Sequence, residues 1–191
     1  MSVLKPIGST DETEQTKDMF ADSRREFDRV LNMVRQMAHS PALLRTYLHF
    51  ARAVDQTTLS ARTRALIAIA VAEINACDYT LSLGMALSRR HGIEDAELDA
   101  AREGRGLDVG TDDTLRFVAS ILRRAGRVPH ADVERLRHQG FTDQTIVEVV
   151  ATVALNVFRD YFNLVAGTDI DFPLVRTRGG ARLAEIPRRE A

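Results

Sequence analysis

The sequence is poor in several residue types, and each shortage excludes a class of protein. It contains one cysteine, Cys77, so no disulfide can form within the chain. Of its 26 basic residues only two are lysines, an imbalance that we attribute to codon usage rather than to function. The longest apolar run, from Ala65 to Ala72, is far shorter than the ~20 residues that cross a bilayer. Because residues 1–16 also lack the apolar stretch of a secretory signal, we expect a cytoplasmic protein that does not bind a membrane.

Charge and short motifs exclude further classes. The net charge of −1 gives no field that attracts nucleic acid, and no N-terminal helix-turn-helix carries a basic recognition helix. A glycine-rich phosphate loop and a serine nucleophile elbow are both missing, so no cofactor is indicated. None of the five histidines pairs with another at metal-ligand spacing beside a carboxylate or thiol, so no metal site is expected.

Apolar periodicity is the main structural signal in the chain. Apolar residues recur at steps of three and four, strand patterns are missing, and 191 residues suffice for one core. We therefore predict an all-α, single-domain bundle of about eight helices. A flexible segment is expected at 1–16, a helical domain at 17–173 and a tail at 174–191. The predicted helices cover 18–38, 41–54, 62–74, 78–90, 94–103, 112–125, 130–139 and 146–166.

Two of these helices are expected at the centre of the bundle. Residues 62–74 and 146–166 carry apolar side chains around the whole helix circumference. A helix that is apolar on every side is typical of a buried position. The same excess of apolar surface in a chain of this length suggests patches that a second copy would cover.

Three stretches carry a resemblance to a known family. They are 38–44 (AHSPALL), 59–79 (from Leu59-Ser60 to AEINACDY) and 156–173 (from Asn156 through YFN to TDIDFP). In order and spacing they resemble the carboxymuconolactone decarboxylase and alkylhydroperoxidase-D-like family, in its peroxidase-related branch, over about residues 20–173. The resemblance implies an all-helical fold and a homo-oligomer, as trimers or a dimer of trimers.

The resemblance also implies a set of catalytic positions, and most of them are changed here. Peroxidase-active members carry Cys-x-x-Cys-x-x-x-His at a helix start, with a glutamate twelve residues before the first cysteine. Cys77 occupies the first cysteine position, but Thr80 and Gly84 replace the second cysteine and the histidine, and Ala65 replaces the glutamate. A histidine that many members carry after Tyr-Phe-Asn is Leu164.

These replacements remove the family's redox chemistry. Two thiols one helical turn apart can close a disulfide, whereas a threonine hydroxyl cannot. Without the relay base and its acid partner, the remaining thiol also lacks activation. We therefore predict negligible dithiol-dependent peroxide turnover, and the resemblance alone does not decide whether the chain is an enzyme.

Several residues remain as candidates for a modified site. Cys77 is either a reactive thiolate or a small buried hydrophobe, and Glu73 is either an acid/base group or half of a structural ion pair. Asn75 and Tyr79 either line the site or satisfy backbone groups between two helices. Because the replacements are small or apolar, a cavity is expected where the redox centre would be, with Cys77 and Glu73 as candidate catalytic groups. Its predicted lining is Ala65, Ile69, Glu73, Asn75, Cys77, Tyr79, Thr80, Gly84 and Leu164.

Three functions fit this pattern. The first is a family member without the dithiol centre that binds, or acts non-oxidatively on, a small apolar or acyl-type molecule. The second is a one-cysteine peroxidase that uses Cys77 and an external thiol. The third is a non-catalytic assembly partner of an active paralogue.

Overall fold

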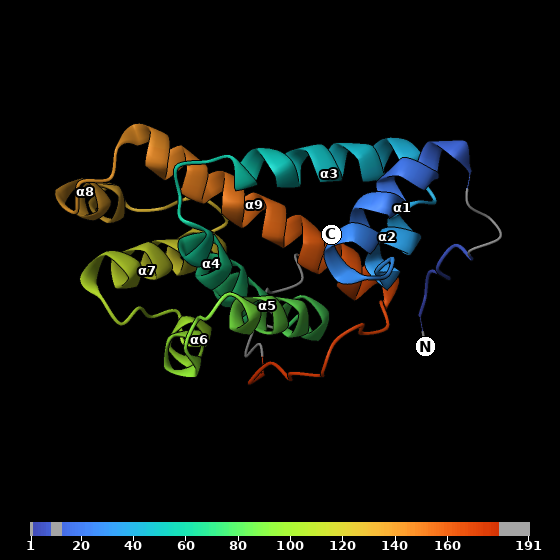
Figure 1. Cartoon of the computed structure of the whole chain (residues 1–191). Coiled ribbons are helices and arrows are strands. Elements are labelled where there is room, and N and C mark those ends of the chain that lie inside the picture. Colours follow the sequence, from blue (N-terminus) through green and yellow to red (C-terminus); the bar gives the residue numbers. More distant parts are fainter. Residues whose placement is uncertain (1, 9–12, 180–191) are drawn as a thin grey trace, which may run out of the picture.

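The computed structural model of the chain describes residues 2–8 and 13–179, and within these it is all-helical (Figure 1). This confirms the predicted fold class. The nine helices of the described residues are α1 (Glu14–Phe27), α2 (Asn32–Met37), α3 (Pro41–Asp55), α4 (Ala61–Ile74), α5 (Asp78–Arg90), α6 (Asp95–Arg102), α7 (Val109–Arg123), α8 (His130–His138) and α9 (Asp143–Ala166).

Helix α4 lies at the centre of the bundle, as its composition predicted. Ser60 caps its start, where the hydroxyl accepts a hydrogen bond from the Thr63 amide at 3.0 Å. From there the helix packs against α5, α6, α7 and α9 (Figure 1). Its apolar residues Ile67, Ile69 and Val71 are fully buried, so this helix anchors the main hydrophobic core.

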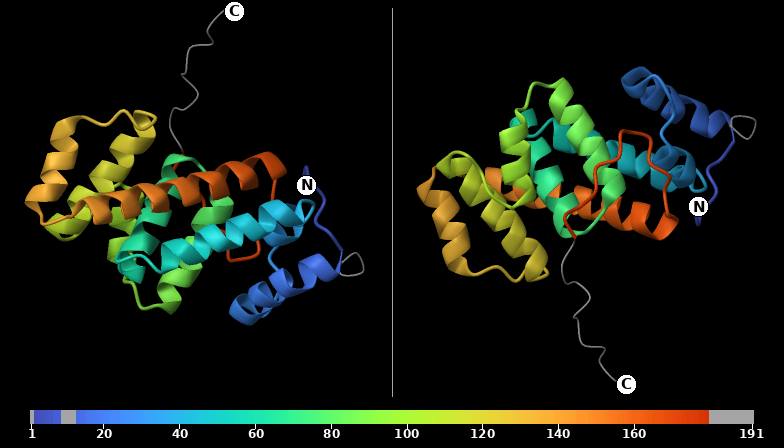
Figure 2. Two further views of the ribbon diagram at one scale, coloured as in Figure 1. Left: turned by 90° about the horizontal axis from the view of Figure 1, so that it is seen from above. Right: turned by 90° about the horizontal axis from the view of Figure 1, so that it is seen from below.

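Helix α9 is buried on one side only, which corrects the prediction for 146–166. It runs along the outside of the bundle beside α3 (Figure 2). Val147 is 66% exposed, Val165 is 72% exposed and Tyr161 is 53% exposed. α9 is also the one helix of the described residues that is long and apolar enough for a membrane crossing, a test that core helices of soluble proteins pass as well. In this soluble-type fold it leaves an apolar stripe uncovered.

The chain breaks between α1 and α2, where the periodicity predicted one continuous helix over 18–38. Asp28 takes a left-handed conformation with φ 58° and ends α1. The Ser23 hydroxyl then holds the turn, because it donates to the Arg29 carbonyl and accepts from the Leu31 amide, both at 3.1 Å. Local polar contacts of this kind compete with helix continuation and leave no trace in apolar spacing.

Both ends of the described chain pack against the bundle. Near the N-terminus, the amides of Val3 and Leu4 donate to the Ala166 carbonyl at the end of α9. After α9 the chain turns back across α4 and α5 (Figure 2). There the amide of Val175 donates to Ser82 and that of Thr177 to Asp78, both at 2.9 Å. The first part of the predicted tail, through residue 179, is thus docked, whereas 180–191 lie outside the described residues.

Candidate functional site

A cavity of about 430 Å³ lies among α1, α2, α3, α4, α5 and α9. We call it the central cavity. Its wall is apolar over the larger part of its area, with polar side chains from α1, α3, α4, α5 and α9. The residues that carry the argument below are Asp22, Tyr47, Asp55, Arg64, Ala65, Ala68, Thr80, Gly84, Ser88, Asn156 and Arg159. A concave, largely apolar space with a few polar groups is the usual form of a small-molecule site.

The structure brings three of the predicted lining residues together. Ala65 of α4 faces the cavity beside Thr80 and Gly84 of α5. These are the positions at which the resemblance places the glutamate, the second cysteine and the histidine of peroxidase-active members. Ile69 lies beneath Gly84, since a Cβ at Gly84 would stand 3.4 Å from Ile69 Cγ1. Ile69 is itself fully buried and lies outside the lining.

Leu164 and Tyr79 do not reach the cavity, contrary to expectation. Leu164 is 48% exposed on the outer side of α9, because that side of the helix is uncovered. The Tyr79 hydroxyl donates to Asp171 Oδ2 at 2.6 Å, which fixes the segment after α9. Burial, followed by the Asp171 carboxylate, raises the pKa of Tyr79. Tyr79 therefore acts as an anchor and not as a proton donor to the cavity.

Glu73 takes the structural role that the sequence left open. Its Oε2 accepts a hydrogen bond from Arg102 Nε at 2.7 Å, with side-chain exposures of only 8% and 10%. Its second oxygen accepts from the backbone amide of Arg178. Both carboxylate oxygens are thus occupied at the junction of α4, α6 and the docked tail. This corrects the expectation that Glu73 supplies a proton in the cavity.

The structure places Cys77 in the core as a buried, free thiol. It is 1% exposed, and its Sγ lies 3.4 Å from Thr80 Oγ1. Burial, followed by the nearby Asp160 carboxylate, raises the pKa of Cys77 to about 11. Because the thiolate is the reactive form, burial disfavours reaction of Cys77 at neutral pH.

Sequence reasoning missed Asp160, the acid buried closest to the site. Its side chain is 0% exposed, Oδ2 accepts from Asn75 Nδ2 at 2.8 Å, and Oδ1 has no hydrogen-bond partner. Burial raises the pKa of Asp160 to about 6, although Asn75 and Arg159 lower it. With Asn75, Cys77 and Thr80 it forms what we call the buried polar cluster. Thr80 belongs to both the cluster and the cavity wall, so it connects them.

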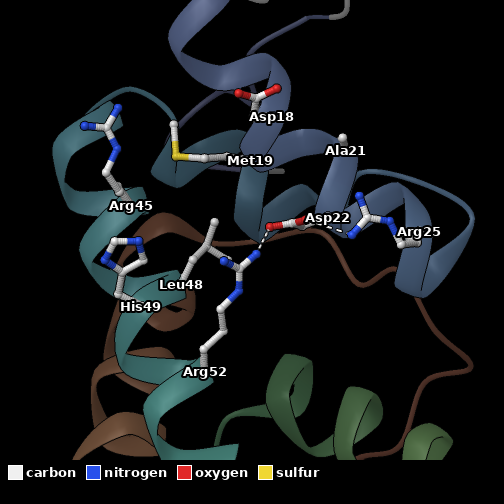
Figure 3. A pocket seen from close by; sticks show the side chains of 9 residues that line it. All are labelled: Asp18, Met19, Ala21, Asp22, Arg25, Arg45, Leu48, His49 and Arg52. Carbon is white, nitrogen blue, oxygen red and sulfur yellow. Dashed lines mark hydrogen bonds and ion pairs between the residues drawn. The ribbon is translucent and has the colours of Figure 1, made fainter.

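A second hollow, of about 380 Å³, lies between α1 and α3 (Figure 3). Its charged side chains include Asp22, which pairs with Arg25 at 3.2 Å and with Arg52. Asp22 and Leu48 also line the central cavity, so the two spaces share a wall. Within the described part of the chain no three histidine, cysteine or acidic side chains come together as a metal site. The central cavity is therefore the candidate site.

The fold is that of alkylhydroperoxidase-D-like helical proteins, and comparison with protein families agrees. Residues 41–124 match the model of the carboxymuconolactone decarboxylase family. Over these residues the match agrees with the family resemblance seen in the motifs. No curated protein matches this sequence.

Solved structures share the fold at low identity. An alkylhydroperoxidase AhpD core, an uncharacterized peroxidase-related protein from Ralstonia eutropha JMP134, superposes with a TM-score of 0.80 at 19% identity, over 89% of this chain and 92% of that one. A peroxidase-related protein from Silicibacter sp. TM1040 gives 0.75 at 21% identity, over 82% and 85%. The debrominase Bmp8, in complex with 2,3,4-tribromopyrrole, gives 0.76 at 15% identity, over 90% and 92%.

Proposed function

We propose that this protein binds, or acts non-oxidatively on, a small apolar or acyl-type molecule in the central cavity. The observation that carries the proposal is the cavity itself, which lies where the resemblance places a redox centre and is lined there by Ala65, Thr80 and Gly84. Its volume falls in the lower part of the roughly 300–1,000 Å³ range of small-molecule pockets. The debrominase with the same fold is seen with a small halogenated ring, which supports a ligand of that size.

The buried polar cluster supports acid/base rather than thiol chemistry. Asp160, with a pKa of about 6, exchanges a proton near neutral pH, and the Thr80 hydroxyl connects it to the cavity. Cys77, whose pKa is about 11, supplies essentially no thiolate at pH 7. The pKa values of Asp160 and Cys77 therefore favour the non-oxidative function over a one-cysteine peroxidase.

Filling the cavity is expected to abolish binding of a neutral aromatic probe. Leucine in place of Ala65 projects into space that a glutamate would occupy in peroxidase-active relatives, so Ala65→Leu removes ligand volume. We expect the parent protein to bind 2-methylnaphthalene in isothermal titration calorimetry, and Ala65→Leu to weaken it at least about tenfold. Ala131→Leu, on an exposed part of α8, is the matched control and keeps the affinity. Equal binding by the two variants would refute a ligand site in the central cavity.

We further propose a cytoplasmic homo-oligomer, as trimers or a dimer of trimers. The exposed apolar residues of α9 support it, since monomers rarely leave a long apolar stripe in water. A charge at Val165 is expected to dissociate the assembly, so Val165→Glu shifts the light-scattering mass toward one chain at micromolar concentration. Val109→Glu, at a similarly exposed valine on α7, leaves the mass unchanged. A monomeric parent protein overturns the proposal.

A further inference from the structure

Arg159 is a charged residue in the wall of the central cavity whose guanidinium makes no direct ion pair among the described residues. Its Nε donates to the Tyr47 hydroxyl at 2.9 Å, and its Nη1 donates to Asn156 Oδ1 at 3.4 Å. A guanidinium carries five N–H donors. Two are used, so both terminal nitrogens keep N–H groups without an acceptor among the described residues.

The other charges of the cavity wall are already paired. Asp55 faces Arg64 at 3.6 Å, and Asp22 pairs with Arg25 and Arg52. Asp160 follows Arg159 in α9, but its carboxylate is turned to Asn75 and makes no ion pair with the guanidinium within the described residues. Arg159 thus makes no direct ion pair in the described chain. Burial lowers the pKa of its guanidinium, but Tyr47 and the charges of Asp160 and Asp55 raise it overall, so Arg159 stays protonated while its terminal N–H groups are left for a ligand.

Two hydroxyls of the same cavity also lack an acceptor. Tyr47 is 6% exposed, and its oxygen accepts from Arg159 while its own O–H has no recorded acceptor in the described chain. Ser88 is 1% exposed, and its Oγ has no hydrogen-bond partner. Buried polar groups without partners are rare in folded proteins. The Tyr47 hydroxyl and the terminal N–H groups of Arg159 therefore lie together as donors without acceptors, an arrangement complementary to an anion.

The Tyr47 ring fixes the direction of the guanidinium. The Arg159 guanidinium carbon lies 5.8 Å from the ring centroid, in a cation–π contact that adds to the Nε hydrogen bond. Because α3 and α9 pack together, ring and guanidinium are held in place before any ligand enters. The terminal nitrogens of a fixed guanidinium match the two oxygens of a planar carboxylate.

We propose that the ligand of the central cavity is a small apolar carboxylate, whose head group binds Arg159 and the Tyr47 hydroxyl while its body contacts the apolar wall. This rests on the proposed function and adds the chemical class of the ligand. The apolar body accounts for most of the cavity volume, and the carboxylate accounts for the donors left without acceptors. Arg159 is a binding residue in this scheme, and no covalent step is involved.

Two probes of equal shape test the proposal by calorimetry. 2-Naphthoate carries the carboxylate, and 2-naphthamide replaces it with a neutral group of the same size. We expect the parent protein to bind the naphthoate at least about tenfold more tightly, since hydrogen bonds to a charged group exceed neutral ones. Arg159→Met keeps the side-chain stem and is expected to abolish this preference, with the naphthamide affinity changed less than about threefold. Arg159→Lys keeps the charge but loses the planar guanidinium that can bind both carboxylate oxygens. We therefore expect its preference for the naphthoate to lie between those of the parent protein and of Arg159→Met.

The outcomes distinguish the carboxylate proposal from the proposed function on which it rests, the binding of a small apolar molecule in the central cavity. Equal binding of both probes by the parent protein, or a naphthoate preference that survives in Arg159→Met, overturns the carboxylate proposal. If 2-methylnaphthalene binds while the naphthoate has no advantage, the cavity is a ligand site for neutral molecules and only this inference fails. If none of the three naphthalenes binds, both proposals fail. Circular dichroism of each variant confirms that the helices are intact.

Discussion

Replacing Arg102 with methionine is expected to lower the free energy of unfolding by about 3–5 kcal/mol, the cost of leaving one half of a buried ion pair. The Glu73 carboxylate is 8% exposed, and without Arg102 only the Arg178 amide is left to solvate its charge. Methionine keeps the apolar stem of the arginine, so the loss reports the missing charge and its hydrogen bonds to Glu73 and to the Arg176 carbonyl rather than a cavity. Thermal unfolding of Arg102→Met should move down by on the order of 10 °C for a chain of this size.

Two further variants test whether loss of the ion pair between Glu73 and Arg102 causes this drop in stability. Arg89→Met removes an ion pair with Asp95 in which both side chains are more than half exposed, and should change stability by less than about 1 kcal/mol. Glu73→Gln combined with Arg102→Met removes both charges, so it should recover part of the loss. A drop for Arg102→Met no larger than that for Arg89→Met would contradict a structural role for Glu73.

The fold was predictable because each helix is marked by local chemistry. Ser40, Ser60 and Thr142 cap α3, α4 and α9 through their side-chain oxygens, and Gly167 ends α9 in a left-handed conformation. Those boundaries follow from the sequence to within a few residues. The break at Asp28 does not follow, because the Ser23 contacts that stabilise it depend on how the chain turns.

The site was predictable only in part. The motif positions indicate which residues of consecutive helices lie close together, but they do not indicate the contacts that these residues make with distant parts of the chain. Ala65, Thr80 and Gly84 meet as expected because α4 and α5 are consecutive and joined by a tight break. The Glu73 carboxylate instead accepts hydrogen bonds from the Arg102 side chain and the Arg178 amide, which come from distant parts of the chain.

Arg159 and Asp160 did leave a signal in the sequence. They are two adjacent charges inside the long apolar run of α9, where an unpaired charge is costly. The spacing of residues in the motifs gave no reason to inspect them. Their partners, Tyr47 and Asn75, become apparent only once α3 and α4 are packed against α9.

Asp160 is expected to make the protein less stable as the pH rises from about 4 to about 7. Its pKa is about 6 in the folded state, raised from an ordinary value of 3.8 by burial. Below the ordinary value the carboxyl is protonated in both states and costs nothing. Between the two values it ionises only on unfolding, which favours the unfolded chain, and above pH 6 the full cost is present. A shift of about two pKa units corresponds to roughly 3 kcal/mol.

Asp160→Asn removes this titration while keeping a side chain of the same shape, whose carbonyl oxygen can still accept from Asn75. The difference in unfolding free energy between this variant and the parent, measured in urea from pH 4 to pH 8, should therefore grow toward the variant with rising pH. Because it is a difference, the effects of all other acids cancel. Asp95→Asn controls for the loss of one acidic charge at an exposed site. A difference for Asp160→Asn that stays flat across this range would show that Asp160 ionises in the folded protein as it does in water, and would remove it as the acid/base group of the site.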